Sequence, residues 1–218
     1  MAHIVLLGDS IFDKGRYTGD GPDVISQVRR LLPAGWQASL LAVDGATTEN
    51  VPSQLPCIPS DASHLVLSVG GNDALMISGI LHMPAESTSQ VLATLANASS
   101  RFEENYRRGV DACRRLGLPL TLCTIYNGCF PDADLQRLVS TALTVFNDAI
   151  LRVGIEFSLS MIEFAFRLFI AFRLCKPNRA FFFGRCQNRQ HDCEAGLGRT
   201  TRERGCPSVH LLRDAFFA

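Results

Sequence analysis

The sequence has no excess of charge of either sign, because its 218 residues hold 21 Lys and Arg against 21 Asp and Glu. Such a chain has no bulk attraction for nucleic acid or for an anionic membrane. We also expect no membrane span. The apolar stretch 161–174 contains Glu163, Arg167 and Arg173 and is shorter than the roughly 20 residues that cross a bilayer. Met1–Leu7 lacks the basic lead of a signal peptide. We expect a soluble, cytoplasmic protein.

A cysteine arrangement typical of disulfides or of zinc is absent too. Disulfides are rare in the cytoplasm, so Cys57, Cys113, Cys123 and Cys129 are predicted to be small apolar core residues. The other cysteines lie near the C-terminus, where a zinc site is conceivable, but its first pair is separated by six residues instead of two to four. We therefore predict no metal. The residues of that rejected site are Cys186, His191, Cys193, Cys206 and His210.

Apolar runs that end at glycine alternate with helical patterns along the chain. Hydrophobic residues make up 47% and charged residues 19%, which is typical of a globular domain. The alternation predicts a parallel five-stranded sheet with helices on both faces, a three-layer flavodoxin-like α/β fold. The expected strands are His3–Leu7, Ser39–Val43, His64–Val69, Leu118–Ile125 and Leu159–Ile162, and the expected helices are Asp23–Leu32, Ala85–Leu116 and Ala133–Val153.

Three glycine-rich motifs follow three consecutive predicted strands. Gly8-Asp9-Ser10 follows the first, Gly45 lies after the second, and Gly70-Gly71-Asn72-Asp73 follows the third. Sites in open parallel sheets lie at the carboxyl ends of the strands. A serine there can act as a nucleophile. Backbone N–H groups beside glycine, and an Asn amide, are the donors of an oxyanion hole.

These motifs resemble the first three blocks of the SGNH (GDSL-type) hydrolases. The resemblance covers about residues 3–162, and the segments 124–126 and 130–132 fit a bacterial subgroup. It implies ester hydrolysis through an acyl-serine at Ser10. The Ser10 N–H, the Gly45 N–H and Asn72 would form the oxyanion hole. Asp9 and Asp73 are read as support for their turns. The chemistry requires no cofactor.

The fourth block of that family, Asp-x-x-His, does not occur in this chain. Its His is the general base, and its Asp orients the His. His3 and His64 begin predicted strands, His82 lies in a loop, and His191 and His210 lie near the C-terminus. The general base is therefore unknown.

The C-terminal segment 163–218 differs in composition from the rest of the chain. It holds ten Lys and Arg and five Asp and Glu, a net charge of +5, which leaves −5 for residues 1–162. When one nucleotide is removed near the codon of Phe164, back-translation permits a reading similar to the family's last block. In that reading a glutamate stands at the position of the family's His, where this chain has Arg179. We predict a hydrolase domain over 1–162 and an out-of-frame segment over 163–218.

The predicted function is hydrolysis of small carboxylic esters or acyl groups, impaired by loss of the last block. The expected partner is a small-molecule ester, with no nucleic acid and no membrane, and the oligomeric state is left open. One alternative is a non-catalytic member of the fold that binds an acyl or glycan ligand. A nucleotide-binding flavodoxin-like domain is disfavoured, since no Gly-rich phosphate loop follows the first strand.

Overall fold

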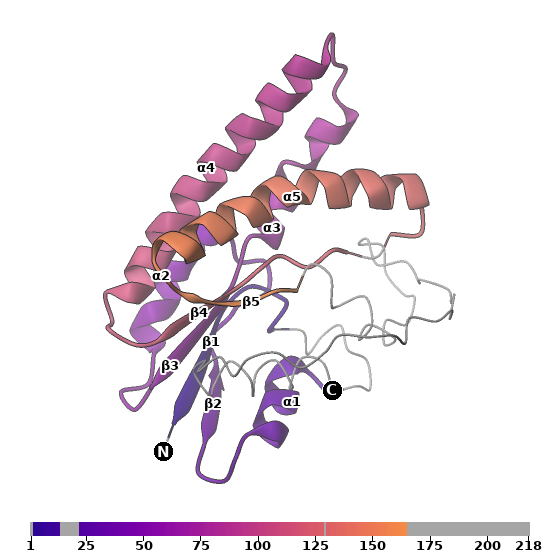
Figure 1. Ribbon diagram of the computed structural model, residues 1–218. Helices are drawn as coiled ribbons and strands as arrows, with labels where there is room; N and C mark the ends of the chain where they lie inside the picture. Colours follow the sequence, from indigo (N-terminus) through magenta and orange to yellow (C-terminus); the bar gives the residue numbers. More distant parts are fainter. Residues whose placement is uncertain (1, 14–21, 129, 165–218) are drawn as a thin grey trace, which may run out of the picture.

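The sheet is parallel and has helices on both faces (Figure 1). The computed structural model describes residues 2–13, 22–128 and 130–164. Within them all neighbouring strands pair in parallel, in the order β2-β1-β3-β4-β5. This confirms the fold class predicted from the alternation of apolar runs and helical patterns. The strands are β1 (His3–Gly8), β2 (Gln37–Leu40), β3 (His64–Ser68), β4 (Leu120–Cys123) and β5 (Ser160–Ile162).

The central strand β1 divides the core into two layers. All six of its residues are buried, and alternate residues of a strand face opposite sides of the sheet. Ile4 and Leu6 belong to the cluster that contains Ile25 and Val28 of α1 (Val24–Leu31). Val5 and Leu7 belong to the larger cluster on the opposite face. That face is covered by α2 (Val51–Gln54), α4 (Thr88–Arg114) and α5 (Ala133–Glu156).

The three longer helices begin at side chains that cap their first N–H groups. Asp23 accepts from Ser26 N in front of α1, Ser87 from Gln90 N in front of α4, and Asp132 from Asp134 N and Leu135 N in front of α5. Oxygen side chains at this position satisfy donors that have no partner inside the helix. These caps set the helix starts close to the predicted ones.

Helix α5 is apolar enough and long enough to span a membrane by those two criteria alone. Its position in the fold accounts for its composition. Five of its apolar residues form one buried face in the larger core cluster, against α4 and the sheet. They are Leu143, Phe146, Ala149, Ile150 and Val153.

The structure corrects the bounds of the second strand and adds short helices. The run Ser39–Val43 was predicted as a strand, but β2 covers Gln37–Leu40. The ladder ends because Leu41 N and Ala42 N both donate to the same carbonyl of Leu6, and Val43 is 53% exposed. The helices missed by the sequence patterns are η1 (Thr48–Asn50), α2, η2 (Leu55–Cys57), α3 (Gly71–Met76) and η3 (Ser78–His82).

Two of the four cysteines predicted to be core residues are buried. Cys113 and Cys123 lie in the core, where burial raises the pKa of the Cys113 thiol to about 12 and suppresses its reactivity. Cys57 is exposed in η2, so that prediction was wrong for it. Pro56 immediately precedes it in this short surface helix, which lies outside the sheet. Cys129 and the cysteines of the C-terminal segment lie outside the described residues.

We expect Tyr106→Phe to stabilise the protein by about 1 kcal/mol, since a buried hydroxyl without a partner costs about 1–3 kcal/mol. The Tyr106 hydroxyl has no hydrogen-bond partner within the described part of the chain, and its residue is 1% exposed. Burial also raises the pKa of Tyr106 well above its usual range. Chemical denaturation would measure the gain as a higher midpoint concentration of denaturant, with an unchanged dependence of the unfolding free energy on that concentration. Phe146→Leu in the same cluster is the control with the opposite sign, and a lower unfolding free energy for Tyr106→Phe would contradict the expectation.

Candidate active site

The Gly8-Asp9-Ser10 motif leaves the carboxyl end of β1 through a turn that only glycine permits. Gly8 has φ +121°, and a Cβ there would lie 1.8 Å from the carbonyl oxygen of Ser68 on β3. Asp9 N donates to that oxygen at 2.9 Å, and the Asp9 carboxylate accepts from Ile11 N at 3.2 Å. The turn places Ser10, which is half-buried, at the carboxyl edge of the sheet.

The loop after β2 presents Gly45 at the same edge. Gly45 is exposed, has φ +82°, and a Cβ built on it meets nothing within 4 Å. The neighbouring Asp44 N donates to the Asp13 carboxylate at 3.1 Å, and this bond connects the loop to the segment that follows Ser10. The backbone around Gly45 is therefore open to a ligand and fixed to the first motif.

The third motif holds the second through two side chains. Gly70 begins α3 with φ +126°. The Asn72 amide nitrogen donates to the Ala46 carbonyl at 2.8 Å. The Asp73 carboxylate accepts from Thr48 N at 3.1 Å and from the Thr48 hydroxyl at 2.6 Å. Asp73 thus supports the neighbouring loop, whereas Asp9 caps its own turn.

The buried amides of Gln54 and Asn147 fix two strand ends, and neither was predicted from the sequence. Gln54 in α2 accepts from Gly8 N and donates to Gly8 O, both at 2.8 Å. Asn147 in α5 does the same to Ile125, which follows β4, at 2.8 and 3.0 Å. Asn147 had one sequence signal, a lone amide within the apolar face of a predicted helix, and Gln54 had none. These paired bonds hold the backbone on which the site depends.

No histidine in the described part of the chain lies beside Ser10. His3 and His64 begin β1 and β3, at the amino edge of the sheet, and His82 is exposed at the end of η3. His191 and His210 lie outside the described residues. Glu163 follows β5 at the carboxyl edge and accepts from the Thr124 hydroxyl at 3.4 Å. The structure thus leaves the general base unassigned.

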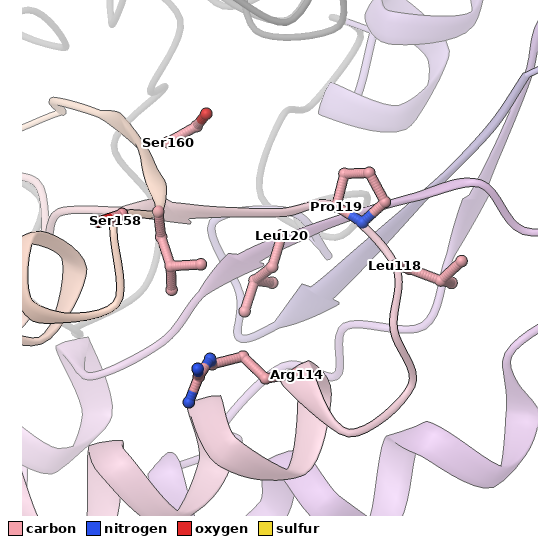
Figure 2. A pocket seen from close by; sticks show the side chains of 7 residues that line it. Arg114, Leu118, Pro119, Leu120, Ser158 and Ser160 are labelled. Carbon is pink, nitrogen blue, oxygen red and sulfur yellow. The ribbon is translucent and has the colours of Figure 1, made fainter.

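A shallow pocket lies at the candidate site, and another lies elsewhere in the described regions. A pocket of about 270 Å³ is bordered by the Gly45 loop and by Asn50, Ser53 and Gln54. The other, about 340 Å³, lies near the amino ends of β4 and β5 (Figure 2). Its cation, Arg114, lies 3.8 Å over the Phe157 ring and pairs with Asp111, so it is engaged within the protein. Across residues 2–13, 22–128 and 130–164, no group of three His, Cys, Asp or Glu could bind a metal ion.

Comparison with protein families identifies this arrangement. The model of the GDSL-like lipase/acylhydrolase family matches residues 6–207. The chain belongs to this family. The GDSL-like family consists of lipases and acylhydrolases, so the protein is a carboxylic ester hydrolase, as the three motifs predicted.

Solved structures share the fold of this GDSL-like hydrolase at low sequence identity. An extracellular lipase from Streptomyces rimosus is 18% identical, with 80% of this chain and 85% of that chain covered and a TM-score of 0.57. The SGNH-hydrolase family esterase AlinE4 is 17% identical, with coverages of 83% and 85% and a TM-score of 0.57. A phospholipase A1 from Streptomyces albidoflavus NA297 is 16% identical, with coverages of 73% and 78% and a TM-score of 0.55. No curated protein matches the sequence at a significant level.

Proposed function

We propose that this GDSL-like hydrolase cleaves small carboxylic esters through an acyl intermediate on Ser10. One observation carries the proposal: Ser10, Gly45 and Asn72 follow three neighbouring strands and are joined by hydrogen bonds between their loops. Preorganised donors beside a nucleophile are what acyl transfer requires.

The oxyanion donors are proposed to be the N–H groups of Ser10 and Gly45 and the side-chain amide of Asn72. An amide nitrogen carries two hydrogens. One hydrogen of the Asn72 amide is used for the Ala46 carbonyl at 2.8 Å, which fixes the orientation of the group. The second hydrogen is then available to a substrate oxygen. Because Gly45 has no side chain, its N–H can be reached by the same oxygen.

The test of this function is covalent labelling of Ser10 by a fluorophosphonate, located by peptide mass spectrometry. Stoichiometric labelling at Ser10 supports the enzyme. An intact fold, seen by circular dichroism, with an unlabelled Ser10 would favour the non-catalytic acyl- or glycan-binding member of the fold instead.

We also infer that the segment after Glu163 is an out-of-frame reading of the family's closing block. The net charge of +5 in 163–218 against −5 in 1–162, and the alternative codon reading, support this inference. Sequencing of the gene tests it directly. A nucleotide sequence whose shifted codons do not place a glutamate at the position of Arg179 would refute it.

Asp73→Asn is expected to lower kcat for a nitrophenyl ester about 10- to 100-fold while leaving KM nearly unchanged. Asp73 is a positioning residue, because its carboxylate accepts both donors of the buried Thr48 and so fixes the loop that presents the Gly45 N–H. Losing one oxyanion donor costs about 10²–10³ in kcat, and a displaced donor costs part of that. Steady-state kinetics would measure the split between kcat and KM.

Asp111→Asn is the matched control, because Asp111 pairs with Arg114 on the surface of α4, away from the site. The double variant Asp73→Asn with Thr48→Val is expected to be no slower than the slower single variant, since both remove the same contact. Additive losses, or a change confined to KM, would contradict the positioning role.

A further inference from the structure

We propose that Ser39 is a second nucleophilic serine, activated by His3 and Asp61, which accepts an acyl or phosphonyl group from an activated ester. The hydroxyl oxygen of Ser39 lies 2.8 Å from Nε2 of His3. Nδ1 of the same ring lies 2.9 Å from the Asp61 carboxylate. Both distances fall within the range expected for a nucleophile, its base and the group that orients the base. The proposal does not depend on the role of Ser10.

The chemistry of the three groups determines where the protons lie. An ionised carboxylate only accepts hydrogen bonds, so Nδ1 of His3 carries the hydrogen that Asp61 receives. The hydrogen bond from His3 lowers the pKa of Asp61, which keeps this carboxylate ionised at neutral pH. Nε2 is then an acceptor, and the Ser39 hydroxyl donates to it. This is the tautomer in which histidine can remove a proton from serine.

The neighbouring loop and strand hold the His3 backbone in place. His3 N donates to the Ser63 hydroxyl at 2.8 Å, and the His3 side chain is 8% exposed. Strand pairing fixes Ser39 opposite Val5. A base held on a strand of the sheet loses little freedom when it reacts, which favours proton transfer.

Ser39 is accessible from solvent and distant from Ser10. It is half-buried on β2, an edge strand of the sheet in the described structure. Its partner Val5 lies three residues before Gly8, the last residue of β1, which is roughly 10 Å along a strand. Gly45 and Asn72 follow the carboxyl ends of the strands, so Ser39 lacks their donors. We therefore infer acylation of Ser39 without efficient turnover.

The proposed step with a fluorophosphonate is a displacement at phosphorus. The Ser39 oxygen forms a bond to phosphorus while its proton passes to Nε2 of His3. The phosphorus–fluorine bond breaks, and fluoride leaves with the bonding electrons. The imidazolium then releases its proton to water. With a nitrophenyl ester, the same oxygen bonds to the carbonyl carbon and nitrophenolate departs.

The experiment uses the full chain carrying Ser10→Ala, a fluorophosphonate, and peptide mass spectrometry over time. Ser53 and Ser78 are internal controls, because both are exposed and their hydroxyls donate to backbone carbonyls, of Asn50 and Leu75. We expect Ser39 to be modified at least about ten times faster than either, in keeping with the 10²–10⁴-fold effect of a positioned base. This comparison is made within one sample, so it does not depend on how any triad variant folds.

Asp61→Asn then tests whether Asp61 orients His3. The Asp61 side chain is 65% exposed, so its replacement does not disturb the core. The modification rate of Ser39 is expected to fall at least about tenfold, since an amide no longer selects the required tautomer. Equal rates at Ser39, Ser53 and Ser78 would overturn the proposal, as would a Ser39 rate unchanged by Asp61→Asn. Labelling of Ser10 in the unsubstituted chain is read on a different peptide, so the two sites succeed or fail separately.

Discussion

Ser10→Ala is expected to lower steady-state hydrolysis of nitrophenyl acetate by at least about 10³-fold in the chain with its closing block restored. Loss of a serine nucleophile removes the covalent route and leaves only what oxyanion donors and binding supply. Ser10 is the serine at the end of β1, on a turn that requires Gly8 and that Asp9 caps. Continuous release of nitrophenolate at 400 nm would measure the loss.

Ser78→Ala is the matched control, because Ser78 is exposed in η3, outside the candidate site, and its hydroxyl donates to the Leu75 carbonyl. Its rate is expected to stay within about twofold of the parent, as for most surface substitutions. Ser39 is proposed to give at most one equivalent of nitrophenolate, which appears as a burst and not as turnover. Steady turnover that survives Ser10→Ala would exclude Ser10 as the nucleophile.

Restoring the reading frame near the codon of Phe164 is expected to raise kcat for the same ester by about 10²–10⁴-fold over the present chain. A positioned general base is worth about that much, and the described residues place no histidine beside Ser10. On the out-of-frame hypothesis, the restored segment supplies a carboxylate where the family has its His, and a closing helix.

Two variants of the restored protein separate these contributions. Replacing the restored glutamate by glutamine is expected to remove most of the gain while leaving the unfolding free energy close to that of the restored parent. Ser10→Ala in the same background is expected to remove all of it. A restored protein that folds but hydrolyses no faster than the present chain would contradict the out-of-frame hypothesis and favour the binding role.

The fold was predictable because its strands are short apolar runs buried on both faces. His3–Leu7 and His64–Val69 matched β1 and β3 within one residue, since the centres of both runs, Ile4–Leu7 and Leu65–Leu67, are buried aliphatic residues. The strand predicted over Ser39–Val43 had the wrong bounds, because an apolar residue such as Val43 can also lie in an exposed loop. The short helices between residues 48 and 57 were not predicted, because a segment of four or fewer residues shows no helical period.

The turns of the candidate site were predictable because their motifs are local, and the catalytic roles of Ser10, Gly45 and Asn72 stay predictions. Gly8-Asp9-Ser10 and Gly70–Asp73 are contiguous, so the turns they form follow from glycine and from acidic side chains. The bonds that join the loops were not predictable, because Thr48 and Asp73 are 25 residues apart and Gln54 and Gly8 are 46 apart. A single sequence contains no signal for such pairs. The same applies to His3, Ser39 and Asp61, which sheet pairing and one loop bring together.

Three hydrogen bonds join the loops at the carboxyl edge within the described part of the chain. Asn72 holds Ala46, Asp73 holds Thr48, and Gln54 holds Gly8, all within residues 8–73. For protein engineering, it follows from the proposed roles that the oxyanion donors and the general base are separate components, so that a base can be supplied from outside the chain. Imidazole added to the solvent is then expected to raise the rate without any change in the loops.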